Sequence, residues 1–212
     1  MTEKTTAEKY SDFYKTELGM KILEQESKYI VSKLKNCKKV LSIGCGPAFI
    51  EARAAELNPK LSIIGLDSSK EMLKFAPISV YKILGDAEKL GVRAQTVDAV
   101  LYITALEFIE NYKKAVLEAV RVLKAKGKLL ALILNPNSDY FKQGYAKNGY
   151  LQRHIKHLNI ERLEEFVAHY FSINTEYFLG IKNSTVFETT DPKLAGLYVI
   201  NGIKKVKRSA KV

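Results

Sequence analysis

A short apolar segment that runs into a glycine-rich turn constrains the fold of this chain more than any other feature. Residues 39–43, Lys-Val-Leu-Ser-Ile, predict a buried strand, and the sequence Gly-Cys-Gly-Pro follows at residues 44–47. Residues 48–57 then predict a helix that ends before Pro59. Glycines let the backbone approach a ligand, and the start of a helix presents free N–H groups. A strand, a glycine turn and a helix in this order therefore predict an α/β fold that binds a nucleotide-like ligand.

Apolar segments alternate with helical segments over the first 134 residues. Further strands are predicted at 61–66, 80–84, 99–103 and 129–134, and further helices at 70–75 and 111–123. Strands that are apolar throughout and alternate with helices indicate a parallel sheet buried on both faces. Residues 172–207 alternate in places and predict two last strands, centred on Tyr177 and Val199. We expect a doubly wound, Rossmann-like, mostly parallel seven-stranded sheet with helices on both faces.

Three segments lie outside this alternation. Residues 11–36 have apolar side chains near helical spacing and predict one or two helices, with a break at Gly19. Residues 135–151 combine turn-forming residues with aromatic ones, which indicates a packed lid or a substrate loop. Residues 159–171 predict one more helix, capped by Asn159. We expect a single domain over 1–212, divided into an N-terminal helical lid (1–36), a cofactor-binding core (37–135), and a substrate loop with the last strands (136–212).

The composition favours a cytoplasmic protein. No stretch reaches the ~20 apolar residues that span a bilayer, so we expect no membrane insertion. Residues 1–9 are polar and charged, without the apolar region of a secretory signal. The chain has two cysteines, Cys37 and Cys45, which are too few for a disulfide framework and fit a reducing compartment.

The net charge of +11 leaves nucleic acid open as a partner. The basic residues are scattered along the chain, apart from a cluster in the C-terminal tail formed by Lys204, Lys205, Lys207, Arg208 and Lys211. This basic surface and tail predict either a solvated segment or a contact with a polyanion.

The residues around the turn help to select the ligand. Asp67 ends the second predicted strand, 23 residues after Gly44, a position that suits hydrogen bonds to ribose hydroxyls. The dinucleotide pattern G-x-G-x-x-G would place glycine at position 49, where this chain has Phe49. A bulky side chain there argues against a pyrophosphate at the helix start. It favours a ligand without phosphates, contacted through an adenosine and an amino-acid part.

At this point the chain resembles the class I S-adenosylmethionine-dependent methyltransferases. Their first motif is acid-x-Gly-x-Gly-x-Gly, and residues 42–48 are Ser-Ile-Gly-Cys-Gly-Pro-Ala. The two central glycines match, Ala48 replaces the third, and Ser42 replaces the acid that helps to order the polar end of the cofactor. Residues 64–73, 84–90, 97–109 and 121–129 resemble the later motifs of the family in the same order. The resemblance covers residues 40–134 and implies S-adenosylmethionine as the cofactor.

The resemblance also implies roles for individual residues. Asp67 would accept from the ribose hydroxyls and Ser68 would flank the adenine. Asp86 would accept from the adenine amino group, and the Ala87 N–H would donate to a ring nitrogen. A backbone carbonyl near Tyr102 or Ile103 would accept from the cofactor's ammonium group. The full set of expected cofactor-binding residues is Gly44, Gly46, Asp67, Ser68, Asp86, Ala87, Tyr102, Ile103, Tyr10 and Tyr14.

The two tyrosines come from an N-terminal element. Residues 10–14, Tyr-Ser-Asp-Phe-Tyr, resemble the segment of many small-molecule methyltransferases in which an aromatic residue closes over the cofactor. Tyr10 or Tyr14 would do so here. The alternative is that these aromatic side chains simply pack a helix onto the core.

Candidates for chemistry beyond cofactor binding are few. Glu107 follows the fourth predicted strand, where it would orient a substrate or accept a proton, or else begin a solvent-exposed helix. His154 and His157 are three residues apart and so could share a helical face, but no cysteine or paired acid completes a metal site with them or with His169, and none is predicted. Cys45 is expected to be a small filler within the turn.

Three classes of function compete. The N-terminal aromatic helix and the aromatic segment 135–151 favour a methyltransferase with a small-molecule acceptor. The net charge favours a tRNA, rRNA or protein methyltransferase. Ser42 in place of an acid allows a non-catalytic S-adenosylmethionine-binding protein.

Overall fold

The computed structural model describes residues 4–147 and 149–206, and over these residues the core is one sheet of eight strands in the order β3-β2-β1-β4-β5-β8-β6-β7. The first five are parallel neighbours: β3 (Tyr81–Leu84), β2 (Ser62–Asp67), β1 (Lys39–Ile43), β4 (Val97–Ile103) and β5 (Leu123–Leu134). β8 (Ala195–Lys204) is antiparallel to both β5 and β6 (Phe171–Lys182). The predicted α/β fold is therefore confirmed.

The last strands lie where the alternation of residues predicted them. Tyr177 of β6 pairs with Tyr198 of β8, next to the predicted centre at Val199. The expected number of seven strands is one too low, because β6 turns at Asn183 and Ser184, both with positive φ, into the short strand β7 (Thr185–Phe187). Three residues are too short for a periodicity to be recognised.

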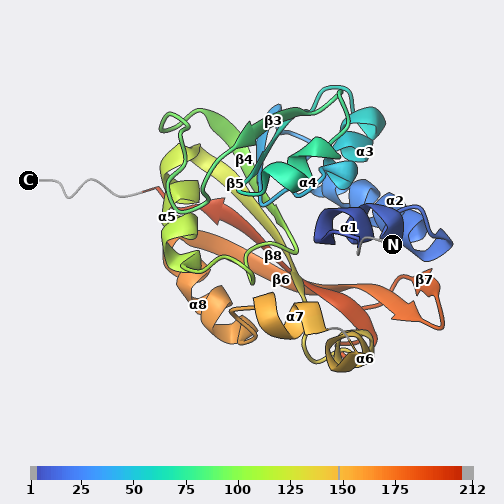
Figure 1. The fold of residues 1–212 in the computed structure, drawn as a ribbon. Coiled ribbons are helices and arrows are strands. Elements are labelled where there is room, and N and C mark those ends of the chain that lie inside the picture. The colour runs from blue at the N-terminus through green and yellow to red at the C-terminus, as the bar shows by residue number, and fades with distance from the viewer. Residues whose placement is uncertain (1–3, 148, 207–212) are drawn as a thin grey trace, which may run out of the picture.

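Helices cover both faces of the sheet (Figure 1). α5 (Tyr112–Val122) and α8 (Ile160–Tyr170) pack their apolar residues against one face of the sheet, where they contact side chains of β4 and β5. α2 (Glu17–Lys33) and α3 (Phe49–Leu57) pack on the other face. The short helix α4 (Lys70–Lys74) lies against α3. None of the helices in the described part of the chain is long and apolar enough to cross a membrane.

The N-terminal segment forms two helices, α1 (Thr6–Phe13) and α2. The predicted break at Gly19 is wrong, because the chain turns at residues 14–16 and Thr16 caps α2 by accepting a hydrogen bond from the N–H of Gly19. A Cβ at position 19 would lie 2.0 Å from the carbonyl oxygen of Phe13. The glycine thus allows the first turn of α2 to pack directly on the end of α1.

The segment 135–151 is largely helical instead of an irregular loop. It contains α6 (Asp139–Lys147) and the start of α7 (Gly149–His154). The turn-forming residues begin these helices: the Ser138 hydroxyl accepts a hydrogen bond of 3.0 Å from the N–H of Phe141. The buried Asn135 amide donates to the carbonyls of Pro192 and Ala195 at 2.7 and 2.8 Å. These bonds hold the start of the segment to β8.

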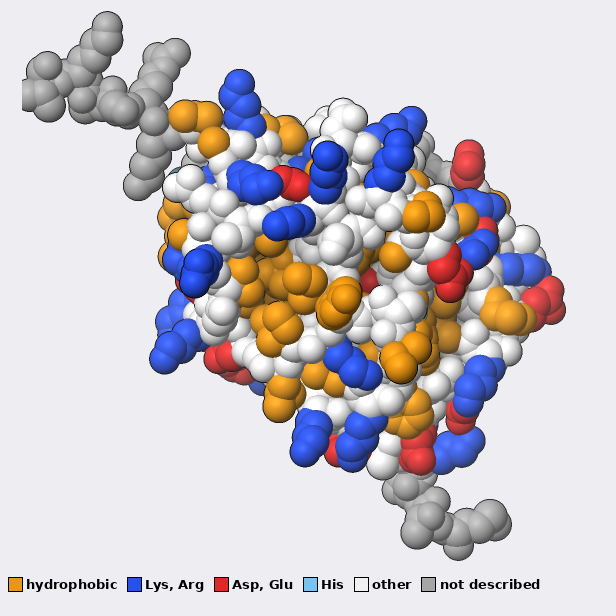
Figure 2. Space-filling view, turned by 90° about the horizontal axis from the view of Figure 1, so that it is seen from above, with side chains coloured by type: hydrophobic (Ala, Val, Ile, Leu, Met, Phe, Trp, Pro, Cys, Tyr) orange, Lys and Arg blue, Asp and Glu red, His pale blue; other side chains and the backbone are white. Residues whose placement is uncertain are grey.

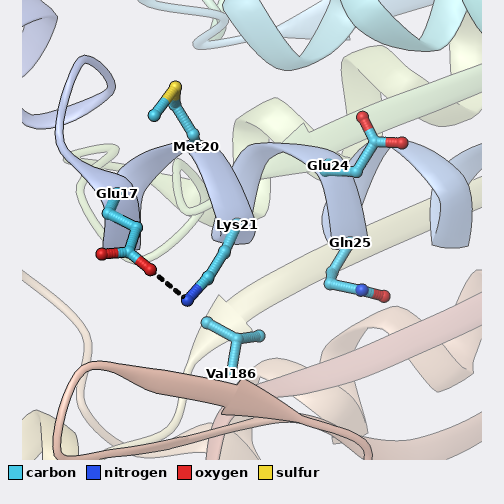
Figure 3. Close-up of a pocket in the computed structure, with 6 residues that line it drawn as sticks. All are labelled: Glu17, Met20, Lys21, Glu24, Gln25 and Val186. Carbon is cyan, nitrogen blue, oxygen red and sulfur yellow. Dashed lines mark hydrogen bonds and ion pairs between the residues drawn. The ribbon is translucent and has the colours of Figure 1, made fainter.

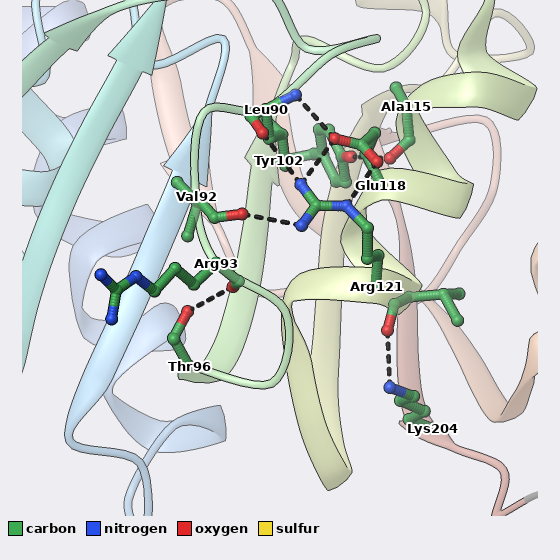
Figure 4. Close-up of polar contacts among 10 residues, drawn as sticks. Leu90, Val92, Arg93, Thr96, Tyr102, Ala115, Glu118, Arg121 and Lys204 are labelled. Carbon is green, nitrogen blue, oxygen red and sulfur yellow. Dashed lines mark hydrogen bonds and ion pairs between the residues drawn. The ribbon is translucent and has the colours of Figure 1, made fainter.

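The loop between β3 and β4 is tied to α5 by Arg121 (Figure 4). Its guanidinium donates to the carbonyls of Val92 and Leu90 at 2.8 Å each, and it forms an ion pair with Glu118. Glu118 in turn accepts a hydrogen bond of 2.7 Å from the N–H of Leu90. These bonds fix residues 90–92 of the loop to α5.

Candidate cofactor site

The predicted cofactor residues come together at the carboxyl ends of β2, β1 and β4. β1 is the first of these strands in the chain, and its two neighbours, β2 and β4, lie on opposite sides of it. Loops that leave neighbouring parallel strands on opposite sides create a crevice at the strand ends, where α/β sheets bind ligands.

The two glycines of the turn have different roles. Gly44 and Gly46 have φ angles of 71° and 54°, in the left-handed region. A Cβ on Gly44 would lie 2.6 Å from the Cβ of Ala105, whereas a Cβ on Gly46 would meet no atom within 4 Å. Gly44 therefore lets the turn pack on the segment after β4, and Gly46 leaves open space above the turn. Ala48, in place of the third glycine, keeps a left-handed φ of 53°.

Asp67 at the end of β2 closes the turn. Its Oδ2 accepts a hydrogen bond of 2.7 Å from the N–H of Gly46, and its Oδ1 accepts one of 2.8 Å from the N–H of Ser69. Each carboxylate oxygen has two lone pairs, so both keep capacity for a ligand hydroxyl. Ser69, instead of Ser68, caps α4, and Ser68 is exposed beside the carboxylate.

Asp86 and Ala87 lie next to Asp67 at the end of β3. The N–H of Gly85 donates a hydrogen bond of 3.0 Å to the carbonyl of Asp67. The exposed Asp86 accepts a hydrogen bond of 2.8 Å from the N–H of Glu88, while Ala87 is half-buried. Both residues thus follow the end of β3, beside Asp67, where the resemblance to the family predicts that the adenine binds.

Tyr102 and Ile103 lie in the last part of β4, and both are buried. The Tyr102 hydroxyl donates to the carbonyl of Ala115 in α5 at 3.0 Å, so its side chain belongs to the core. The side chains at these two positions are therefore part of the core, and the expected contact of a backbone carbonyl with a ligand stays a prediction.

The N-terminal tyrosines lie over the turn through Phe49. The hydroxyl oxygens of Tyr10 and Tyr14 are 3.4 Å apart, and the ring of Tyr14 meets the ring of Phe49 edge to face at a centroid distance of 5.7 Å. Phe49 is the first residue of α3. The bulky residue that argues against a dinucleotide is therefore the residue that holds the aromatic helix α1 beside the glycine turn.

Two buried glutamates beside the turn were not predicted. Glu51 in the first turn of α3 accepts a hydrogen bond of 2.6 Å from the Ser42 hydroxyl, and both residues are buried. Glu26 of α2 is 4% exposed, and no described residue donates a hydrogen bond to its carboxylate. A signal was present in the sequence, because Glu26 has the helical spacing of the buried residues Ile22 and Ile30.

Burial changes the pKa values of both glutamates, and their charges affect the N-terminal tyrosine Tyr10. Burial raises the pKa of Glu26 to about 8, with the charge of Glu51 as a second cause. Burial also raises the pKa of Glu51 to about 7, against the effect of the Ser42 hydrogen bond. Desolvation raises the pKa of Tyr10 to about 12, and the charges of Glu26 and Glu51 add to this increase, although about a third of the residue, 36%, is exposed.

Two tyrosines of the segment α6–α7 are near the acids of this edge. Burial raises the pKa of Tyr140 in α6, with the charge of Glu26 as a second cause. Burial likewise raises the pKa of Tyr150 in α7, with the charge of Asp67 as a second cause. α1 and the α6–α7 segment thus both border the strand ends that carry the glycine turn.

Glu107 is buried, at 1% exposure, so the prediction of a solvent-exposed helix start is wrong. Its Oε1 accepts a hydrogen bond of 2.9 Å from the N–H of Leu134, and Oε2 has no partner among the described residues. Burial raises the pKa of Glu107 to about 7. The side chain joins the ends of β4 and β5, which is a structural role, while Oε2 remains free.

The three histidines contact backbone carbonyls at separate places. His154 and His157 contact the carbonyls of Tyr150 and Ile109 at 2.8 and 2.9 Å, and His169 contacts that of Glu165 at 2.7 Å. His154 and His157 do not share a helical face, because α7 ends at His154. Over residues 4–147 and 149–206, no three His, Cys, Asp or Glu side chains are grouped as a metal site. Burial raises the pKa of the Cys45 thiol, as suits a filler within the turn.

The surface has a shallow depression away from this edge (Figure 3). It lies between the outer side of α2 and β7, and it contains an ion pair of 2.6 Å between Glu17 and Lys21.

In the view from above, hydrophobic side chains gather at the centre, and Lys and Arg side chains are spread around them without merging into one patch (Figure 2).

Comparison with known proteins places this geometry in a family. Residues 41–131 match the model of the family described as a methyltransferase domain. Over these residues the chain is similar to the methyltransferase domain family, and its fold is that of Rossmann-like methyltransferases. The matched residues contain the glycine turn, Asp67, Asp86 and the end of β4, so the family's region coincides with the strand ends described above.

The curated relatives match this chain over about half of its length. A demethylmenaquinone methyltransferase of Thermotoga maritima is 33% identical over 110 residues, which are 50% of this chain and 48% of that protein. An uncharacterized protein of Methanocaldococcus jannaschii is 33% identical over 117 residues, 55% of this chain and 51% of its own. The chain thus spans about half the length of these two curated relatives.

The fold is shared over nearly the whole chain. The crystal structure of an S-adenosylmethionine-dependent methyltransferase of Thermotoga maritima, described as a possible histamine N-methyltransferase, has a TM-score of 0.76 at 21% identity. The alignment covers 94% of this chain and 96% of that one. At this identity the likeness shows the fold alone.

Proposed function

We propose that this chain is an S-adenosylmethionine-dependent methyltransferase with a small-molecule acceptor. The observation that carries the proposal is the arrangement around the glycine turn. A Cβ on Gly46 would meet open space, the N–H of Gly46 donates to the carboxylate of Asp67, and Phe49, just after the turn, contacts Tyr14 at the end of α1. An acceptor for the ribose, a backbone that a ligand can approach, and an aromatic cover fit an adenosine with an amino-acid part.

The residues of the chain would then bind and orient the cofactor. Asp67 holds the ribose hydroxyls, Asp86 and Ala87 contact the adenine, and Ser68 flanks it. Gly44 and Gly46 shape the turn, and the β4 backbone near Tyr102 and Ile103 accepts from the ammonium group. S-adenosylmethionine supplies a methyl group that is already activated on a sulfonium, so the protein mainly has to position the acceptor and exclude water.

The acceptor class follows from what borders the site. Tyr10 and Tyr14 lie on one side, and Tyr140 and Tyr150 of the α6–α7 segment approach from the other. Aromatic side chains on both sides of a cofactor site suit a small acceptor that is largely enclosed. Two free, buried cysteines also fit a cytoplasmic location.

Calorimetric titration tests the cofactor. We expect S-adenosylmethionine and S-adenosylhomocysteine to bind the wild-type chain with micromolar affinity, and Asp67→Ala to lose both. NAD is the control, because Phe49 stands where a dinucleotide turn has glycine. Binding of NAD alone would reject the proposal.

Turnover then separates the remaining functions. S-adenosylhomocysteine release is measured with a panel of small amines, phenols and quinols, and with total RNA at low and high salt. Turnover on a small molecule supports the proposal. Salt-sensitive turnover on RNA would favour the function suggested by the net charge of +11. Cofactor binding without turnover on either panel would favour a non-catalytic binding protein.

A further inference from the structure

The chain lacks the acid of the first family motif, yet the carboxylate of Glu51 lies beside the position where that acid would be. Ser42 is on β1, two residues before Gly44, and its hydroxyl donates to Oε1 of Glu51 at 2.6 Å. Glu51 comes from α3, which begins immediately after the turn. The carboxylate of Glu51, from α3, is therefore hydrogen-bonded to the side chain at the position where the family has its acid.

We propose that Glu51 and Glu26 take the place of the acid missing at Ser42 and bind the positively charged amino group in the methionine part of the cofactor. This inference rests on the proposed function. It assigns the recognition of the ammonium group to two residues of α3 and α2 that lie outside the family's motifs in the sequence.

Glu26 provides the second, independent observation. Its side chain is 96% buried, because only 4% of the residue is exposed, and no described residue donates a hydrogen bond to the carboxylate. Buried carboxylates are normally paired or hydrogen-bonded, because the charged form is expensive to remove from water. Among the described residues, no Lys or Arg forms an ion pair with Glu26 or Glu51. A pair of buried acids without a protein cation fits a cation brought by the ligand.

The two glutamates also lie on the correct side of the site. The charges of both Glu26 and Glu51 affect Tyr10 of α1 and Tyr14, the residue that ends α1, and the charge of Glu26 affects Tyr140 of α6. Thr104, the first residue after β4, is close enough to Tyr10 to lower the pKa of its hydroxyl slightly, against the larger effect of burial. The glutamates thus share their surroundings with the end of β4, where the backbone is expected to accept from the same ammonium group.

Proton release gives this subsite a signature. Both carboxylates have a raised pKa, about 8 for Glu26 and about 7 for Glu51, and a cation binds their ionised forms. The titratable groups that face them are Tyr10, Tyr14, Tyr140, Cys45 and Asp67. The pKa values of the three tyrosines and of Cys45 are raised above their ordinary values, so these groups stay protonated from pH 6 to 8. We therefore expect affinity for a ligand with an ammonium group to increase between pH 6 and pH 8.

The test compares two ligands on the full chain. S-adenosylhomocysteine carries the amino group, whereas 5′-methylthioadenosine shares the adenosine and the sulfur but lacks the amino-acid part. We expect Glu51→Gln and Glu26→Gln each to weaken S-adenosylhomocysteine by about tenfold to a hundredfold, the loss of a charge-assisted hydrogen bond, and to leave 5′-methylthioadenosine unchanged. The pH dependence of S-adenosylhomocysteine binding should shrink in both variants. Unchanged binding of 5′-methylthioadenosine shows that each variant is folded, and it controls for Asp67, which would contact both ligands.

A rescue separates charge from packing. In the Glu51→Gln background we expect Ser42→Asp to restore S-adenosylhomocysteine affinity to within about threefold of wild type, because it returns a carboxylate to the family's own position. Glu56→Gln is the matched control, since Glu56 is also on α3 but is exposed and paired with Arg53 at 3.0 Å. It should bind both ligands as wild type does.

Each outcome has one meaning. Equal S-adenosylhomocysteine affinity in wild type, Glu51→Gln and Glu26→Gln would overturn the inference while the proposed function stood. Equal weakening of both ligands, or failure of Ser42→Asp to restore affinity, would assign the glutamates to packing and would also overturn it. If the wild-type chain binds neither ligand, the proposed function itself fails.

Discussion

The Oδ2 atom of Asp67 accepts a hydrogen bond of 2.7 Å from the backbone N–H of Gly46, so the residue expected to bind ribose also closes the glycine turn. Asp67→Ala would leave the N–H groups of Gly46 and Ser69 without this acceptor. We expect it to lower the free energy of unfolding by about 1–3 kcal/mol in the absence of any ligand.

Asp67→Asn keeps one acceptor oxygen and should lose less stability. Urea denaturation of wild type and both variants without ligand measures the difference. Equal stability of all three proteins would show that the carboxylate does not support the turn, and the loss of cofactor in Asp67→Ala would then report binding alone.

Gly44 and Gly46 should respond differently to alanine. Both have positive φ, which is less favourable for alanine by about 1 kcal/mol. Gly44→Ala adds an overlap with the Cβ of Ala105, at 2.6 Å, so we expect a total loss of about 2–4 kcal/mol in unfolding free energy. Gly46→Ala places its methyl group in open space, so we expect about 1 kcal/mol of lost stability but a tenfold or greater loss of S-adenosylhomocysteine affinity. Denaturation and calorimetry on the two variants check this; a larger loss of stability in Gly46→Ala than in Gly44→Ala would contradict it.

The contact between Tyr14 and Phe49 should slow the release of the cofactor. An edge-to-face aromatic pair contributes about 0.5–1.5 kcal/mol beyond its buried area. We expect Phe49→Leu to speed the dissociation of S-adenosylhomocysteine by about threefold to tenfold, because α1 is held less firmly over the turn. Stopped-flow displacement measures the rate. Phe178→Leu is the control. It removes the stacking of Phe178 on Tyr29 of α2, whose ring centroids are 4.0 Å apart, and it should leave the rate unchanged.

Glu107 should make stability depend on pH. Burial raises its pKa in the folded state to about 7, from an ordinary value of 4.5. Between these values the folded state binds more protons than the unfolded state, so this contribution to stability is complete below pH 4.5 and is lost as pH rises through 7. Glu107→Gln, which has no charge to bury, should therefore be more stable than wild type at pH 8, by up to about 3 kcal/mol, and no more stable at pH 4.5.

Thermal denaturation at the two pH values measures this difference. Glu26 and Glu51 titrate in the same range, but they do so in both proteins and drop out of the comparison. An equal difference between variant and wild type at pH 4.5 and pH 8 would show that Glu107 does not titrate in this range. A fall in turnover of Glu107→Gln with unchanged stability would instead support the catalytic role considered from the sequence.

Much of the fold could be predicted because its signals are local. The turn at residues 44–47, the apolar strands and the cap at Asn159 each depend on residues close in the sequence. The structure has the first four predicted strands within two residues of their expected bounds. The fifth begins at Leu123 and not at residue 129, because Leu123 pairs with Val97 of β4. The predicted loop 135–151 failed for a local reason as well: the residues that usually mark a loop here serve as helix starts, as Ser138 does for α6. The short strand β7 is held only by pairing with β6.

The sequence by itself determined the order of strands and helices along the chain, the glycine turn, and the acids Asp67 and Asp86 at the ends of β2 and β3, because backbone preferences and hydrophobic periodicity act between near neighbours. The tertiary structure alone decided that Phe49 would contact Tyr14, that Glu107 and Glu26 would be buried, and that Glu51 would accept a hydrogen bond from Ser42. Those relationships join residues from different elements. Sheet order and helix packing bring such residues together, and no pattern along one segment contains that information.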